Sequence, residues 1–198
     1  MKSAHTPATR KTVGEIRIIG GTHRSRRLPV LLAEGLRPSS DRVRETVFNW
    51  LQHLWGNDWS DKHVLDAFAG SGALGFEAAS RGAGSVILVE KNKTIAAQLT
   101  ANRDKLAATQ CRVLAQDALA ALATLGHQKM DLIFLDPPFK QNLLKACLPL
   151  VLTSLASDGY VYIESEAALD DACLENLVMV REGKTAQVRF GLYQKAAE

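Results

Sequence analysis

Three glycines between an apolar run and an Ala-rich stretch have the spacing of a nucleotide-binding loop. The segment Asp66–Gly75 reads DAFAGSGALG and contains a complete GxGxxG pattern at Gly70, Gly72 and Gly75. The first two glycines permit a tight turn and close backbone approach to a ligand, and the third permits close helix packing. Glu90 ends the next apolar run, 20 residues after Gly70, where a carboxylate can accept hydrogen bonds from ribose hydroxyls. Glycines in a simple packed turn give the same pattern, but this context predicts a nucleoside site.

A carboxylate followed by two prolines and an aromatic ring forms a second candidate site. Asp136, Pro137, Pro138 and Phe139 come at the end of the apolar run DLIFLD. The prolines fix the backbone and remove two N–H donors, so the loop presents only acceptors. Such acceptors can bind the N–H bonds of an amino group, and the ring offers a stacking surface for a planar base. The alternative is a rigid loop that ends a strand, with Phe139 in the core.

This tetrapeptide resembles the [D/N]PP[aromatic] loop of methyltransferases that act on exocyclic or amide nitrogen. An aromatic amine is a poor nucleophile because its lone pair is delocalised into the ring. Hydrogen bonds to Asp136 and to the Pro137 carbonyl would draw the nitrogen toward tetrahedral geometry and direct its lone pair at a sulfonium methyl. Positioning and local electrostatics would supply the rate, without a metal ion. The catalytic residues that we predict are Asp136, Pro137, Pro138 and Phe139.

Asp66 bears on which nucleoside the glycine loop binds. Dinucleotide enzymes place such a loop against a pyrophosphate at a helix N-terminus. A carboxylate at the entrance is unfavourable beside phosphate but suits a cationic ligand or an ammonium group. The segment resembles the first motif of the S-adenosylmethionine (SAM) methyltransferases, D-x-F-x-G-x-G, which implies SAM as cofactor.

The same resemblance extends beyond the next two apolar runs. It makes Asp117 the partner of the adenine amino group, although Asp117 can equally cap the Ala-rich helix that follows. Around the motif it implies these cofactor-binding residues: Asp66, Phe68, Ala69, Gly70, Ser71, Gly72, Glu90, Lys91, Asp117 and Ala118.

Arginine dominates the first part of the chain. Residues 1–44 hold ten Lys/Arg against three Asp/Glu, a net charge of +7, and the remainder carries −4, within a total of +3. Arginine suits bidentate phosphate contact, so beside an amino-methylating site this segment predicts a nucleic-acid partner. A solvated charged face is the alternative. The RNA-binding residues that we predict are Arg17, Arg24, Arg26, Arg27, Arg42 and Arg44.

From Lys62 onward, short apolar runs alternate with helical stretches. This alternation predicts an α/β fold whose mostly parallel sheet has helices on both faces. An antiparallel hairpin closes the C-terminal end, and a small hairpin with Pro29 at an edge precedes a helix capped by Ser39 or Ser40. The predicted strands are 15–21, 26–32, 63–68, 85–90, 111–115, 131–136, 160–165, 177–181 and 186–194, and the helices after the glycine loop include 72–81, 94–108 and 141–156.

Four segments together resemble one bacterial family, the 16S ribosomal RNA (guanine-N2)-methyltransferases of the RsmD type. They are RPSSDRVRETVFNWL (37–51), DAFAGSGALGFEAASRGA (66–83), the DPPF loop and the final hairpin, and the resemblance covers about residues 14–195. It implies a Rossmann-like class I SAM-dependent methyltransferase with a seven-stranded sheet, acting on 16S RNA, free or in the assembled small subunit. In that family the first segment closes over the methionine end of SAM, which adds Arg37 and Ser40 to the cofactor-binding residues.

Length and composition limit the other possibilities. The 198 residues favour one main domain, with a disordered tail (1–13), a hairpin extension (14–36) and a methyltransferase domain (37–198). Three scattered cysteines, no signal peptide and no apolar run of membrane-spanning length predict a soluble cytoplasmic protein. The dispersed histidines and cysteines offer no zinc spacing. We expect a monomer, although no pattern fixes the oligomeric state.

Other functions fit the motifs less well. DNA adenine-N6 methyltransferases share the loop chemistry, but no segment here is large enough for a separate sequence-reading domain. Glutamine methylation goes with Asn-Pro-Pro-Tyr, whereas position 136 is Asp. A non-catalytic RNA-binding assembly factor would not need Asp136 and Glu90, and an NAD-linked oxidoreductase has no role for Asp66 or the DPPF loop.

Overall fold

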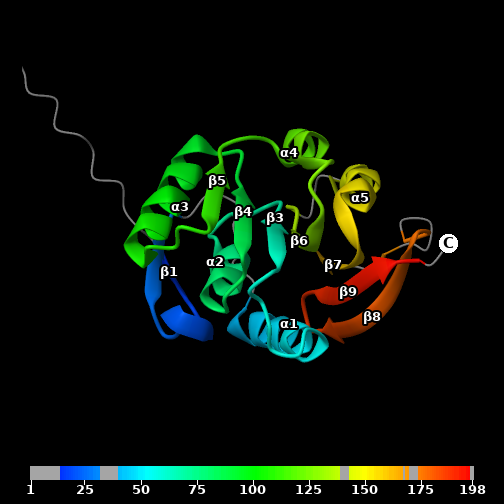
Figure 1. Ribbon diagram of the computed structural model, residues 1–198, viewed down its shortest axis with the longest axis horizontal. Coiled ribbons are helices and arrows are strands. Elements are labelled where there is room, and N and C mark those ends of the chain that lie inside the picture. The colour runs from blue at the N-terminus through cyan, green and yellow to red at the C-terminus, as the bar shows by residue number, and fades with distance from the viewer. Residues whose placement is uncertain (1–13, 32–39, 139–142, 167, 170–173, 197–198) are drawn as a thin grey trace, which may run out of the picture.

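The predicted apolar runs lie side by side in one seven-stranded sheet (Figure 1). The computed structural model describes residues 14–31, 40–138, 143–166, 168–169 and 174–196, and the strand order is β5-β4-β3-β6-β7-β9-β8. Strands β3 to β7 are parallel, and β9 is antiparallel to both of its neighbours. The strands are β3 (His63–Asp66), β4 (Ser85–Val89), β5 (Cys111–Leu114), β6 (Met130–Leu135), β7 (Leu155–Ser165), β8 (Leu177–Lys184) and β9 (Arg189–Lys195).

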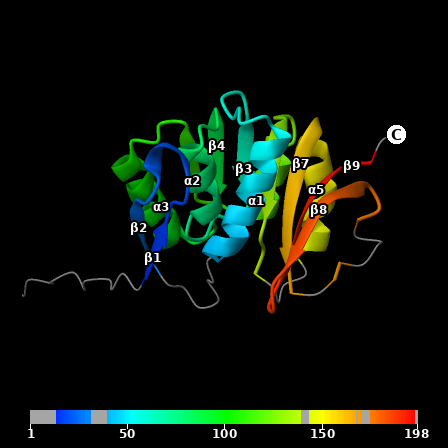
Figure 2. The ribbon, with the colours of Figure 1, turned by 90° about the horizontal axis from the view of Figure 1, so that it is seen from below.

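Helices cover both faces of this sheet, as predicted (Figures 1 and 2). One apolar cluster joins α1, α2 and α3 to the sheet, and a second joins α4 and α5 to the opposite face. The strands are apolar on both sides because neither face of their central part meets water. The helices are α1 (Asp41–Leu54), α2 (Ala73–Ser80), α3 (Lys93–Leu106), α4 (Ala118–Leu125) and α5 (Leu143–Ser154).

The direction in which strands are added to the sheet reverses at β3. The chain proceeds from β3 to β4 and β5 on one side, then crosses back to β6 on the other side of β3. In open α/β sheets, ligands bind at such a reversal of strand order. The glycine loop follows β3 and the DPPF loop follows β6, so both candidate motifs start from this edge.

A separate two-stranded hairpin, β1 (Gly14–Arg17) and β2 (Arg27–Val30), packs against α2 and α3. Its turn contains a 3-10 helix, Gly21–His23, which contacts the C-terminal end of α2: the His23 N–H donates to Ser80 Oγ at 2.9 Å. Because α2 runs back from the carboxyl edge of the sheet, the hairpin tip lies at the opposite, amino edge (Figure 2). Gly21 has φ +73°, and a Cβ there would lie 1.8 Å from the Ser80 carbonyl oxygen, so no other residue fits this contact.

Two local predictions need correction. The helix predicted over 141–156 ends at Ser154, and β7 begins at Leu155 rather than at residue 160. Leu155 pairs with Met130, and the register then shifts before Tyr160 pairs with Leu132. Gly159 lies within this irregular stretch, where a Cβ would come within 2.8 Å of the Met130 carbonyl oxygen. This irregular pairing adds residues 155–159 to β7, although the sequence pattern at 155–156 predicts that the helix continues.

Candidate cofactor and substrate site

The glycine loop makes a left-handed turn directly above the end of β3. Gly70 and Gly72 have φ values of 48° and 80°, a region that glycine enters without strain. A Cβ at Gly72 would lie 2.6 Å from the Phe76 ring, so this position also needs glycine for packing. The Ala69 N–H donates to the Val89 carbonyl at 2.9 Å and ties the loop to the end of β4. The backbone is therefore set for close approach of a ligand.

Glu90 is held in place beside this loop. Its Oε2 accepts from the Gly70 N–H at 3.1 Å, and its Oε1 accepts from the Asn92 N–H at 2.7 Å. Each carboxylate oxygen keeps a further lone-pair direction for an external donor. The fixed, half-buried carboxylate can accept from ribose hydroxyls, and its role in cofactor binding stays a prediction. Lys91, the next residue, is exposed.

Asp66 is buried beneath the glycine loop. It is 2% exposed, and its Oδ2 accepts from the Gly75 N–H at 3.0 Å. Burial raises the pKa of Asp66 to about 7; hydrogen bonds from the Gly75 and Phe68 backbones oppose the rise, and the Glu90 charge adds to it. Asp66 thus joins the end of β3 to the first turn of α2, and its contact with a cofactor stays a prediction.

The raised pKa of Asp66 predicts a pH-dependent stability. Between about pH 4 and pH 7 the native state keeps a proton that the unfolded chain releases, so the free energy of unfolding should fall as pH rises through this window. We expect wild type to lose about 2 kcal/mol between pH 5 and pH 7.5 relative to Asp66→Asn. Urea denaturation of both proteins at each pH measures this difference. Parallel pH profiles for the two proteins would contradict the assignment.

Asp117 does cap the helix that follows it. Its Oδ1 accepts from the Leu119 and Ala120 N–H groups at 2.9 and 3.3 Å, at the start of α4. The side chain is exposed at the end of β5, next to β4 in the sheet. Capping uses one oxygen and leaves Oδ2 for another donor, so an adenine contact is compatible with it and stays a prediction. Ala118 is buried in the first turn of α4.

The DPPF loop follows β6, which lies beside β3 in the sheet. We call it the acceptor loop, for its carboxylate and carbonyl oxygens. The Ala67 N–H donates to the Phe134 carbonyl at 3.1 Å, so the glycine loop and the acceptor loop diverge from neighbouring points of one edge. Asp136 is half-buried, Pro137 is buried and Pro138 is exposed. Phe139 and Arg37 lie outside the described residues. Ser40 caps α1, with its Oγ accepting from the Val43 N–H at 3.3 Å.

A buried pair next to Asp136 was not predicted from the sequence. Glu164, on β7, is 6% exposed, and the hydroxyl of the fully buried Tyr162 donates to its Oε2 at 2.7 Å. Burial and then the Glu164 charge raise the pKa of Tyr162 well above its usual value, and the charge of Asp136 adds to the rise. A glutamate inside the apolar run YVYIES is the local signal that could have identified it.

The prediction of RNA contact is wrong for Arg44. Its side chain is 2% exposed and lies between the hairpin and α2. The guanidinium donates to the Arg17 carbonyl at 2.9 Å, pairs with Asp41 at 2.5 Å, and lies 3.9 Å from the Glu77 carboxylate. The guanidinium is thus buried against these acceptors and is not open to a phosphate backbone in this structure.

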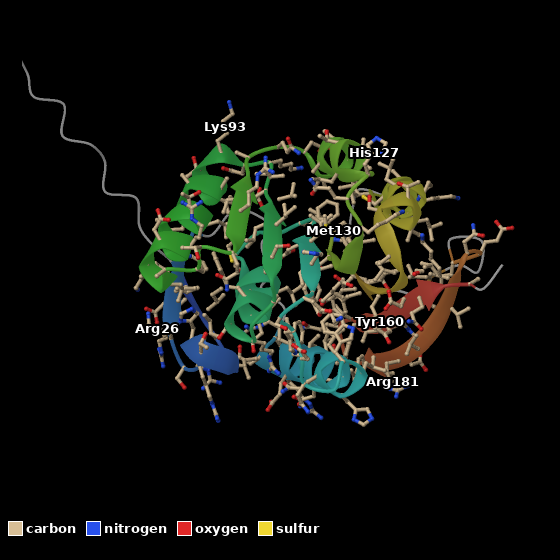
Figure 3. The ribbon with its side chains drawn as sticks, viewed as in Figure 1. Arg26, Lys93, His127, Met130, Tyr160 and Arg181 are labelled. Atoms are coloured by element: carbon tan, nitrogen blue, oxygen red, sulfur yellow. The ribbon has the colours of Figure 1, made fainter. Side chains whose placement is uncertain are left out.

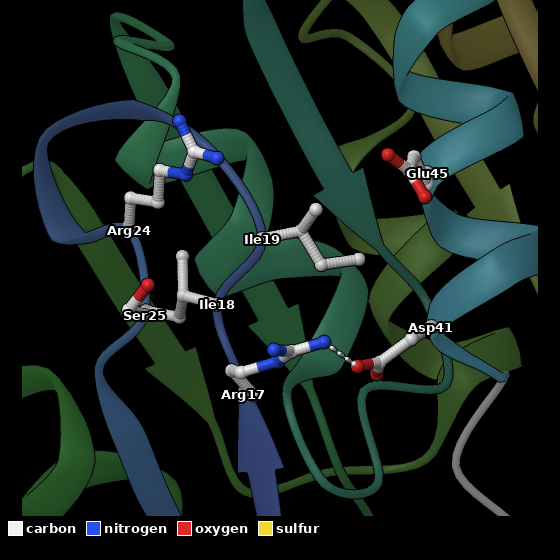
Figure 4. Close-up of a pocket in the computed structure, with 7 residues that line it drawn as sticks. All are labelled: Arg17, Ile18, Ile19, Arg24, Ser25, Asp41 and Glu45. Atoms are coloured by element: carbon white, nitrogen blue, oxygen red, sulfur yellow. Dashed lines mark hydrogen bonds and ion pairs between the residues drawn. The ribbon is translucent and has the colours of Figure 1, made fainter.

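The other predicted RNA-binding arginines are exposed on the hairpin and at the start of α1. Arg17 pairs with Asp41 at 2.8 Å, and Arg27 pairs with Glu15 at 3.3 Å, both at the surface, where such pairs contribute little to stability. Exposed side chains are also found at Arg24, Arg26 and Arg42. A hollow of about 190 Å³ lies between the hairpin and α1. The residues that line it, labelled in Figure 4, are Arg17, Ile18, Ile19, Arg24, Ser25, Asp41 and Glu45.

Within the described part of the chain, no group of three or more His, Cys, Asp and Glu side chains is placed to hold a metal ion. Across the same residues, no helix is long and apolar enough to cross a membrane.

Comparison with known proteins identifies the family. The family described as Conserved hypothetical protein 95 matches residues 16–194. Ribosomal RNA small subunit methyltransferase D of Haemophilus influenzae is 41% identical over 199 residues, covering 98% of this chain and 100% of that protein. The chain belongs to the methyltransferase D family. This confirms the family resemblance that was predicted from the motifs of the sequence and their order along the chain.

Solved structures agree with this family and with the fold. The protein yhhF of Escherichia coli superposes with a TM-score of 0.80 at 38% identity, covering 93% of this chain and 100% of that chain. SMU.776, crystallised with S-adenosylhomocysteine, has a TM-score of 0.62 at 16% identity, covering 84% of this chain and 53% of that chain. At that identity the likeness concerns the fold alone, so this methyltransferase D family member has the Rossmann-like methyltransferase fold that its sequence predicts.

Proposed function

We propose that the protein transfers the methyl group of SAM to the exocyclic N2 of a guanine in small-subunit ribosomal RNA. The observation that carries the proposal is the position of two acceptor groups at one sheet edge: Glu90 beside the glycine loop, and Asp136 with Pro137 after β6. The first set suits a nucleoside and the second an amino group. The relative named Ribosomal RNA small subunit methyltransferase D supports the class of RNA. An rRNA substrate also implies action in the cytoplasm.

Two sets of residues at this edge have separate roles in the proposed reaction: one binds the cofactor and the other binds the target amine. SAM supplies an electrophilic methyl group. The Gly70–Gly72 backbone and Glu90 would hold its nucleoside, with Asp117 at the adenine. Asp136 and the Pro137 carbonyl would accept the two N–H bonds of the target amine and direct its lone pair at the methyl carbon. The same carboxylate can take the proton that the nitrogen loses after transfer.

Reaching this loop requires the target base to leave its stack. An amino group inside an A-form helix cannot approach a carboxylate at the edge of a sheet. The substrate is therefore a loop, a bulge or a flipped nucleotide. Incubating the enzyme with labelled SAM and, separately, assembled small subunits, free 16S RNA and duplex DNA tests the substrate class. We expect label in the ribosomal RNA; label in DNA alone would favour an adenine-N6 methyltransferase instead.

Glu90→Ala should weaken SAM binding by about thirtyfold, since two hydrogen bonds to a charged acceptor are lost. Calorimetric titration of SAM into the variant measures this, and the melting temperature checks that the loop remains folded. Glu90→Gln is the matched control, because it keeps one carbonyl oxygen and should lose less affinity. An unchanged dissociation constant for Glu90→Ala would contradict the ribose assignment.

The hairpin arginines should contribute to RNA affinity through phosphate contacts. Replacing Arg24, Arg26 and Arg27 together by Ala should weaken RNA binding and lower the slope of log K against log salt by about 2, because three phosphate contacts to a single strand are lost. The control replaces Arg181, Lys184 and Arg189, which are exposed on β8 and β9. Arg26 and Arg181 lie far apart in the molecule (Figure 3). Equal salt slopes in the two variants would indicate that the hairpin arginines form a solvated charged face and do not contact RNA.

A further inference from the structure

Glu164 is a buried carboxylate that the reaction proposed above does not use. It lies near the carboxyl end of β7, beside β6 and its acceptor loop, and is 6% exposed. Placing a carboxylate in the interior is unfavourable unless donors satisfy it. Tyr162 supplies one such donor from the same strand. The position of this group, next to the predicted amine site, suggests a role in binding the target base.

Glu164 and Asp136 follow the last residue pair of the β6–β7 ladder. Phe134 pairs with Tyr162, and Leu135 pairs with Ile163, in the parallel β6–β7 ladder. Glu164 and Asp136 directly follow this last pair, and Glu164 shares the Tyr162 face because side chains two residues apart on a strand point to the same side. The Phe134 and Tyr162 rings contact each other with centroids 5.7 Å apart, which shows that the two columns of side chains touch.

This face is the one that α1 covers. Tyr160, two residues before Tyr162, lies on the α1 side of the sheet (Figure 3) and belongs to the apolar cluster that contains Phe134. On this face Glu164 follows Tyr162 toward the carboxyl edge of the sheet, and Asp136 follows the end of the neighbouring strand β6. Two carboxylates therefore come at the carboxyl ends of neighbouring strands, at the edge where the proposed target base must enter.

We propose that Glu164 accepts the N1–H of the target guanine while Asp136 accepts from the N2 amino group, with Tyr162 holding Glu164 in position. This inference rests on the proposed guanine-N2 activity and names the residue that would select the base. Guanine presents N1–H and N2–H donors next to each other, which matches two neighbouring carboxylates. Adenine and cytosine present a ring-nitrogen lone pair beside their amino group, and a carboxylate repels that lone pair.

The base 2-aminopurine separates these contributions. It keeps the exocyclic 2-amino group of guanine, but its N1 is an acceptor and carries no hydrogen. The substrate is a reconstituted small subunit in which the guanine that wild type methylates is replaced by 2-aminopurine through a ligated oligonucleotide. We expect wild type to favour guanine over 2-aminopurine by about a thousandfold in kcat/KM, since a site built for a donor rejects a base without it.

Glu164→Gln should reduce this preference to about tenfold or less, because the amide can donate to N1 of 2-aminopurine. Tyr162→Phe leaves the carboxylate but removes its donor, and should reduce the preference by about threefold to tenfold. The SAM dissociation constant should stay within about twofold of wild type in both variants, because neither residue contacts the predicted nucleoside site. Tyr162→Phe provides the test if Glu164→Gln does not fold.

Two results would overturn the assignment of Glu164. One is similar use of guanine and 2-aminopurine by wild type, and the other is an unchanged preference in the folded variants, even with reduced activity. Either would leave the guanine-N2 activity of wild type standing. Absence of N2 methylation by wild type on the unmodified subunit would instead contradict the proposed function itself, so the two failures are distinguishable.

Discussion

Asp136→Ala should lower kcat for methyl transfer by about a thousandfold while SAM binds as in wild type. The side chain sits at the end of β6, and the predicted ribose carboxylate, Glu90, sits at the end of β4 with β3 between them. Removing Asp136 takes away the acceptor that directs the amine lone pair, but leaves the glycine loop and Glu90 untouched. Single-turnover assays with labelled SAM measure the rate, and calorimetry measures SAM affinity.

Asp136→Asn is the matched control for this prediction. The amide keeps one acceptor oxygen in the same place but loses the charge, so its rate should fall between those of wild type and Asp136→Ala. A rate for Asp136→Ala close to that of wild type would show that the loop does not hold the amine. An equal loss of SAM affinity would instead place Asp136 in the cofactor site.

Glu77→Ala should destabilise the protein by about 3–5 kcal/mol, since it removes a buried charge from a network of donors. The Glu77 carboxylate is fully buried on α2 and accepts from the Ile19 and Gly20 N–H groups at 2.7 and 2.8 Å. It also pairs with Arg81 at 2.9 Å, and Arg44 lies 3.9 Å away. The variant leaves two backbone donors and two guanidinium groups without this acceptor, and urea denaturation measures the loss.

The control for Glu77 is Glu45→Ala, which removes an exposed carboxylate from α1 and should change stability by less than about 0.5 kcal/mol. Glu77→Gln should be intermediate, because its carbonyl can still accept from one backbone N–H. Equal stability of Glu77→Ala and Glu45→Ala would show that this network does not hold the hairpin. A large loss would establish the hairpin as an integral part of the fold.

The glycine loop, the parallel strands and the final hairpin could be predicted because their signals are local. Gly70 and Gly72 sit between a strand and a helix, and their positive φ values follow from the residue type. Ser40 caps α1 as its sequence context indicates. The position of Glu90 at the end of the next strand was also predictable from the βαβ pattern, whereas its hydrogen bond with the Gly70 N–H was not predicted.

The network around Glu77 could not be predicted, because it joins residues far apart in sequence. Ile19 and Glu77 are 58 residues apart, and no pattern in an Ala-rich helix indicates that its one carboxylate meets a hairpin turn. Arg44 shows the same difficulty in the charge count. It contributes to the net charge of +7 of residues 1–44, yet its guanidinium is an interior group that neutralises part of this network.

The identity of the methylated nucleoside tests the central claim most directly. Ribosomal RNA methylated by the protein with labelled SAM is digested to nucleosides, which are separated and identified by mass spectrometry against standards. If Asp136 accepts hydrogen bonds from the exocyclic amine of a guanine, wild type should produce labelled N2-methylguanosine. Asp136→Ala should produce none. Label in a ring-nitrogen product such as 1-methylguanosine or 7-methylguanosine, or in N6-methyladenosine, would contradict it.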